Sequence, residues 1–238
     1  MPGLCDVNTG KWLYAPFSGL ADIPITDIIT EITGMPAYAD NDVNLCALAE
    51  RYFGACRNCD DFLWITVSNG IGGGLFLNGE LYRGSNLTAG EIGHIVVEDD
   101  GRICGCGTRG CLEAMASGAS LSAIYEEKTG IRYSTKELAD YARGGNKEAQ
   151  ELFHSSGYYI GKASANAVNI LGINTIVLGG GVAESFDLLE SGIHKALDRY
   201  VFKPGNPQVN VIHSPLGQYA ALKGCAAIVI DKTKGYTL

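Results

Sequence analysis

Three cysteines lie within a span of eight residues, and one histidine precedes the first of them by ten positions. They are Cys104, Cys106, Cys111 and His94. Three thiolates and one imidazole form a preferred tetrahedral ligand set for structural zinc. Glycines separate the cysteines, and their backbone freedom lets all three sulfurs turn toward one ion. The sequence therefore predicts a closed zinc site in residues 94–111, which strongly restricts how this stretch of chain folds.

Ordinary buried thiols and disulfides are the alternative interpretations of these cysteines. The remaining cysteines form no regular framework, and the N-terminal sequence does not resemble a secretion signal. They are Cys5, Cys46, Cys56, Cys59 and Cys225. Cys56 and Cys59 have a CxxC spacing but lack two further ligands nearby, which favours ordinary thiols near a helix end. We therefore expect reduced thiols and a cytoplasmic location.

The composition is that of a globular protein. The chain has 238 residues and is 46% hydrophobic, which is ample for a packed core. Its net charge is -8 and its basic residues are scattered, which argues against nonspecific binding to nucleic acid. No apolar run approaches the length needed to span a bilayer. We expect neither a nucleic-acid partner nor a membrane partner for this chain.

The hydrophobic pattern changes along the chain between strand and helix periodicity. Strands are predicted near residues 12–14, 37–39, 60–68, 75–77, 175–178 and 209–213. Helices are predicted near residues 26–33, 114–127, 135–142, 147–170, 184–200 and 218–230. Strands that alternate with helices in the second half of the chain predict a layered α/β fold. No low-complexity linker separates residues 1–44 from the rest.

Asp42 follows the strand predicted at residues 37–39 and precedes a helical pattern. Carboxylates at strand ends of α/β proteins commonly face the ligand crevice, so Asp42 could take a proton from a substrate hydroxyl. The alternative is that Asp40 or Asp42 only caps the helix.

Glu91, His94 and Glu113 flank the predicted zinc segment. If the metal folds this segment, the three side chains are held near each other. The carboxylates would accept hydrogen bonds from sugar hydroxyls, and metal-bound His94 would keep one ring N–H. The alternative is that the imidazole only binds the metal while Glu91 and Glu113 are solvated.

Two glycine-rich turns each follow an apolar strand. One spans residues 69–74 and includes Gly70, Gly72 and Gly73, and the other includes Gly179 and Gly180. Exposed backbone amides in such turns can bind phosphate. Neither turn matches the dinucleotide fingerprint or the lysine-containing phosphate loop, so plain tight turns are the alternative.

Five segments together resemble the ROK family of sugar kinases and related repressors. They are Asp40-Asn-Asp-Val-Asn44, Gly70-Ile-Gly-Gly-Gly74, Gly90-Glu-Ile-Gly-His94, the run from Cys104 to Glu113, and Leu178-Gly-Gly-Gly-Val182. The resemblance covers essentially the whole chain. It implies an actin-like, hexokinase-like ATPase fold with two α/β lobes. Residues 1–43 would be the remainder of the N-terminal lobe, and residues 44–217 would form the larger C-terminal lobe. The C-terminal helix, residues 218–238, can join the N-terminal lobe.

The resemblance also implies a role for each site residue. Asp42 would be the catalytic base that draws a proton from a sugar hydroxyl as this hydroxyl attacks the γ-phosphate of ATP. Zinc would be structural, magnesium would accompany ATP, and the two glycine turns would contact the nucleotide. The chain would form a dimer or tetramer. The sugar contacts would be Asn41, Asp42, Glu91, His94 and Glu113.

The chain also departs from the family pattern. The family's kinases begin with an Asp-x-Gly-Gly-Thr hairpin that grips the ATP phosphates, and this sequence has no such motif. The N-terminal lobe is therefore expected to be incomplete, and phosphoryl transfer by this chain to be severely reduced. Phe17 stands where the family often has an asparagine near the sugar, and Asn69 replaces a common threonine.

Three functions follow from these patterns. The leading one is an ATP-dependent hexose kinase of the glucokinase type, with glucose as the expected sugar. The alternative is a sugar-responsive transcriptional regulator that lacks its DNA-binding domain, since the family's repressors share the zinc and sugar motifs. A third is a sugar-binding protein without catalysis.

Overall fold

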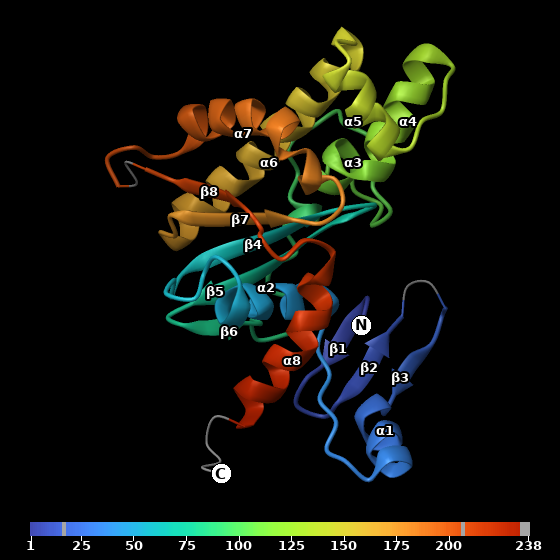
Figure 1. The fold of residues 1–238 in the computed structure, drawn as a ribbon, viewed down its shortest axis with the longest axis vertical. Helices are drawn as coiled ribbons and strands as arrows, with labels where there is room; N and C mark the ends of the chain where they lie inside the picture. The colour runs from blue at the N-terminus through green and yellow to red at the C-terminus, as the bar shows by residue number, and fades with distance from the viewer. Residues whose placement is uncertain (16–17, 206–207, 234–238) are drawn as a thin grey trace.

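The computed structural model describes residues 1–15, 18–205 and 208–233, and it contains two sheets (Figure 1). The smaller sheet is antiparallel and has the order β1-β2-β3. Its strands are β1 (Leu4–Asp6), β2 (Lys11–Tyr14) and β3 (Ala21–Ile23), and helix α1 (Ile25–Thr33) follows them. We refer to this part of the chain, residues 1–33, as the three-stranded unit.

The larger sheet has five strands in the order β6-β5-β4-β7-β8. They are β4 (Phe62–Val67), β5 (Ile71–Leu77), β6 (Glu80–Tyr82), β7 (Thr175–Gly179) and β8 (Asn210–His213). The first three strands are antiparallel neighbours, whereas β7 and β8 run parallel to β4. The carboxyl ends of β4, β7 and β8 therefore meet at one edge of the sheet.

Helices cover both faces of this sheet, as the alternation of buried residues in β4 requires. Phe62 and Trp64 pack toward α2 (Asp42–Phe53) and α8 (Ala220–Thr233). Leu63, Ile65 and Val67 pack toward α6 (Lys147–Leu171) and α7 (Phe186–Tyr200). Figure 1 shows the resulting three layers, with α2 and α8 below the sheet and α6 and α7 above it. The predicted α/β layering is confirmed.

Three shorter helices and the metal segment connect β6 to α6. They are α3 (Leu112–Ala116), α4 (Gly118–Thr129) and α5 (Thr135–Arg143). The single helix predicted over residues 114–127 is wrong, because Ser117 has extended backbone angles and ends α3. The Ser117 side chain then caps α4 by accepting a hydrogen bond from the Ser120 amide. The first amides of α4 bind the carbonyl oxygens of Ser68 and Asn69.

The first glycine-rich segment is also different from the prediction. Gly72, Gly73 and Gly74 lie inside β5, and only residues 68–70 form the turn. A Cβ atom on Gly74 would lie 2.7 Å from the Cβ atom of Ala47 in α2. Glycine is therefore needed here because α2 packs directly on β5. The strand expected at residues 37–39 has no regular structure, whereas β1 and β3 were not predicted.

The three-stranded unit lies beside the larger α/β unit (Figure 1). The predicted division between residues 43 and 44 falls within the first turn of α2, so α2 belongs to the larger unit. Helix α8 packs along α2, and the last five residues of the predicted segment 218–238 lie outside the described residues. No helix in the described ranges combines the length and apolar character that crossing a bilayer requires.

Candidate functional site

The four predicted metal ligands come together in the structure. The ligand atoms of His94, Cys104, Cys106 and Cys111 all lie within 4.8 Å of one another. His94 belongs to the short turn η1 (Ile92–His94), and Cys111 directly precedes α3. The Nδ1 atom of His94 lies 3.6 Å from the Cys104 sulfur, and the sulfurs of Cys106 and Cys111 lie 3.6 Å apart.

These distances fit a tetrahedral metal ion. Zinc bonds of about 2.3 Å to sulfur and about 2.0 Å to nitrogen place neighbouring ligand atoms roughly 3.5–3.8 Å apart in a tetrahedron. Hydrogen bonds from the Thr108 amide and hydroxyl lower the pKa of Cys106 to about 6, so its thiolate is available at neutral pH. Burial raises the pKa of Cys111 to about 12, which a metal ion would offset by binding the thiolate.

Backbone pairing holds the metal segment in shape. The Cys104 amide donates to the Thr108 carbonyl oxygen at 2.8 Å, and the Gly107 amide donates to the Cys104 carbonyl oxygen at 2.9 Å. An ion pair of Arg102 with Glu127, at 2.6 Å, ties the segment to α4. The chain thus brings the cysteines together through local turns as well as through any bound ion.

Asn41 caps α2, and neither Asp40 nor Asp42 has this role. Its side-chain oxygen accepts hydrogen bonds from the amides of Val43 and Asn44 at 2.8 and 3.3 Å. Its side-chain nitrogen donates to the carbonyl oxygen of Gly3 at 2.9 Å. Asp42 is the first residue of the helix, and its carboxylate accepts only the Val43 amide among the described contacts. One carboxylate oxygen of Asp42 therefore remains available to a ligand.

Glu91, His94 and Glu113 lie around the same space. The Nε2 atom of His94 lies 3.9 Å from a Glu91 carboxylate oxygen, on the other ring edge from the cysteines. A Glu113 carboxylate oxygen accepts the Ile71 amide at 2.9 Å, at the start of β5. A Cβ atom on Gly70 would lie 2.5 Å from that oxygen, so the glycine allows Glu113 to reach the turn.

All five predicted sugar contacts line one pocket, which has a volume of about 620 Å³. Gly70 and Gly72 line it as well, and Gly73 lines a smaller adjoining pocket. We refer to the larger pocket as the hexose pocket, after the class of ligand that we propose for it below. Its walls also include residues that the sequence motifs did not indicate, which come from β1, β2, α2, α8 and β4 with the turn that follows it. These are Leu4, Tyr14, Cys46, Thr66, Ser68 and Ala221.

Gly179 and Gly180 lie at the end of β7, next to β4, but they do not line the hexose pocket. Gly179 packs under the Trp64 ring, and Gly180 has φ +93 beside the Val67 carbonyl oxygen. Close packing against β4 thus explains why glycine is needed at both positions, and their contact with a nucleotide stays a prediction. Phe17 lies outside the described residues.

The chain resembles both kinases and repressors. A sequence model of the ROK family matches residues 1–232. The glucokinase of Halalkalibacterium halodurans is 35% identical over 214 residues, which are 84% of this chain and 65% of that protein. The xylose repressor of Bacillus subtilis is 29% identical over 231 residues, which are 97% of this chain and 60% of the repressor. The chain thus spans less than two thirds of the length of either relative.

The crystal structure of a ROK family glucokinase from Streptomyces griseus in complex with glucose and AMPPNP has the same fold. The two structures superpose with a TM-score of 0.84 at 30% sequence identity. The aligned residues are 95% of this chain and 78% of the glucokinase chain. The expected hexokinase-like α/β fold is confirmed by this similarity. From the match over residues 1–232, we conclude that the chain belongs to the ROK family.

Proposed function

We propose that this protein is an ATP-dependent hexose kinase of the glucokinase type. The observation that supports this most directly is the hexose pocket, which is lined by Asp42 of α2, by Glu91 and His94 at η1, and by Glu113 of α3. A pocket lined by three carboxylates, an imidazole and a turn of backbone amides suits a polyhydroxylated ligand, whose hydroxyls need many acceptors.

Asp42 is the proposed catalytic base. Its carboxylate takes the proton of one sugar hydroxyl while the hydroxyl oxygen forms a bond to the γ-phosphorus of ATP, and ADP leaves with the electrons of the broken bond. Asn41, Glu91, His94 and Glu113 are the proposed contacts to the remaining hydroxyls. Phosphoryl transfer depends mainly on such positioning, which rigid elements such as α2 and α3 supply.

We assign a structural role to zinc and the phosphate donor role to ATP with magnesium. His94, Cys104, Cys106 and Cys111 would hold zinc, which would keep His94 and Glu91 at the pocket wall. The turn at residues 68–70 and Gly72 line the pocket, where their backbone can face the phosphates of ATP, and Gly179 and Gly180 are the second proposed nucleotide contact.

The test measures binding and phosphorylation of a panel of hexoses by the purified protein. We expect calorimetry to show binding of glucose and a coupled assay to show slow ADP formation that requires both the sugar and magnesium-ATP. The turnover should be well below that of an efficient kinase, since the sequence has no Asp-x-Gly-Gly-Thr motif to position the phosphates. N-acetylglucosamine, N-acetylmannosamine, fructose and allose serve as competing substrates. Glucose binding without any ADP formation would contradict a kinase and favour the second candidate.

That second candidate is a sugar-responsive regulator. The observation that favours it is the similarity to the xylose repressor over 97% of this chain. A regulator needs the hexose pocket but not turnover, so it would bind sugar without consuming ATP. The two functions are therefore separated by the ADP measurement in the same panel.

A further inference from the structure

Asp40 is a buried carboxylate beside the hexose pocket, and only 2% of its side chain is exposed. One of its oxygens accepts the Asn41 amide at 2.7 Å and the Asn44 side-chain nitrogen at 3.1 Å. The other accepts both the Nε and Nη2 atoms of Arg83, at 3.0 and 2.7 Å. Four donors thus fix this carboxylate, and two of them come from the first turn of α2 or its cap.

Arg83 approaches from a different part of the chain. It follows β6 directly, and its carbonyl oxygen accepts the Ala89 amide at 3.0 Å, which closes the loop that leads to Glu91. Its side chain is 20% exposed, and it lines the small pocket that adjoins the hexose pocket. Asp40, Asn41 and Glu91 line this small pocket too.

The ion pair therefore joins two segments that both line the hexose pocket. One segment is the start of α2 with Asn41 and Asp42, and the other is the loop that ends at Glu91 and His94. Breaking a buried ion pair is costly because the remaining charge has no partner, whereas apolar replacements of both partners often cost nothing. A buried ion pair is thus weak evidence for a role in stability, and the position of this pair between two lining segments points to a role in geometry.

We propose that Arg83 is a positioning residue of the hexose site, which acts through Asp40 to set Asp42 relative to Glu91. This inference rests on the proposed function of the same pocket. Neither residue needs to touch the sugar for this effect. The Arg83 guanidinium makes two bonds to one oxygen, so a lysine at this position would keep the charge but lose the planar geometry.

The test compares Arg83→Met and Arg83→Lys by calorimetry with glucose and by steady-state kinetics. We expect Arg83→Met to weaken glucose binding by about tenfold or more and to lower kcat further, because small misplacements of a catalytic group are expensive. Arg83→Lys should recover part of both losses. If Arg83→Met does not fold, Arg83→Lys decides alone, with a loss of several-fold in kcat/KM.

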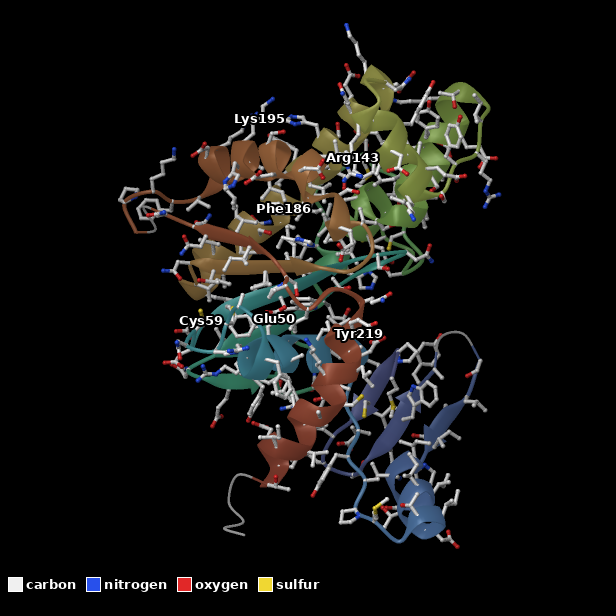
Figure 2. The ribbon with its side chains drawn as sticks, viewed as in Figure 1. Glu50, Cys59, Arg143, Phe186, Lys195 and Tyr219 are labelled. Atoms are coloured by element: carbon white, nitrogen blue, oxygen red, sulfur yellow. The ribbon has the colours of Figure 1, made fainter. Side chains whose placement is uncertain are left out.

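Ser214→Ala provides the matched control. The Ser214 hydroxyl donates to the carboxylate of Glu50, a buried residue of α2 that does not line the hexose pocket. Figure 2 labels Glu50. We expect both Ser214→Ala and Arg83→Lys to lower the melting temperature, because each weakens a buried polar contact. Ser214→Ala should nevertheless bind glucose as tightly as the unmodified protein. Equal glucose binding and turnover in Arg83→Lys and Ser214→Ala would overturn the inference. If the unmodified protein bound none of the hexoses, the proposed function itself would fall.

Discussion

Asp42 is the residue on which the proposed chemistry depends. Asp42→Asn keeps an oxygen that can accept the Val43 amide but cannot take a proton, so α2 should begin as before. We expect kcat to fall by about 10²- to 10⁴-fold, while glucose binding changes little. The measurements are the coupled ADP assay and calorimetry.

Asp27→Asn is the control for Asp42→Asn, since Asp27 lies in the first turn of α1 and does not line the hexose pocket. It should leave kcat unchanged. Wild-type turnover in Asp42→Asn would rule out its role as base. Equal losses of binding and turnover would instead make Asp42 a sugar contact only.

His94 is the residue that the metal cluster and the hexose pocket share. Its Nδ1 edge faces Cys104, and its Nε2 edge faces Glu91. His94→Ala should therefore lose bound zinc and glucose affinity together, as measured by metal analysis and calorimetry. His194→Ala, an exposed histidine paired with Glu190, should change neither. Retention of either property at wild-type strength in His94→Ala would disprove the coupling.

At the scale of single residues, the sequence motifs indicated the residues that line the site but not the residues that hold them in position. The five proposed sugar contacts stand in recognisable segments, and the fold brings them to one pocket. Asp40 and Arg83 lie 43 residues apart, and no local pattern indicates that they pair. Nor did the sequence decide between capping and catalysis at residues 40–42, because that choice depends on which side chain reaches the amides of both Val43 and Asn44.

Among the elements, α2 packs closely against β5 at Gly74. A Cβ atom added at Gly74 would lie 2.7 Å from the Cβ atom of Ala47 and 3.6 Å from the Cα atom of Asn44, so Gly74→Val would push α2 away from the strand. We expect a loss of about 1–3 kcal/mol in the free energy of unfolding from this overpacking, measured by urea denaturation. Gly181→Ala is the control, because its new Cβ would meet only the Ser68 hydroxyl at 3.9 Å. Equal stability of the two variants would contradict the packing argument.

The elements that the sequence predicted best have continuous apolar patterns. β4 and β7 are buried along their lengths, and Asn78-Gly79, a dipeptide that favours tight hairpin turns, connects β5 to β6. The errors arose where tertiary contacts decide. The glycine run 72–74 predicts a turn, but it lies in β5 because α2 packs directly on it. The helical pattern continues through Ser117, but the helix ends there because the amides of Gly118 and Ala119 donate to the carbonyl oxygens of Ser68 and Asn69.

The hexose pocket draws its walls from both parts of the whole molecule. Gly3, Leu4 and Tyr14 come from the three-stranded unit, whereas α2, β5 and the metal segment supply the opposite wall. α1 buries none of its residues, and Ile32 on it is 78% exposed, so few contacts hold this unit in place. A sugar that contacts both walls should therefore stabilise their association.

We expect saturating glucose to decrease the radius of gyration in solution scattering. Hydrogen exchange should slow at residues 3–4 and 41–43 together, because the sugar would bridge these segments. A hexose that shows no binding by calorimetry is the control. Scattering must be recorded at several protein concentrations, since the predicted dimer or tetramer remains a prediction and a shift in assembly would also change the radius. Protection confined to residues 41–43, with an unchanged radius, would show that the larger unit alone binds the sugar.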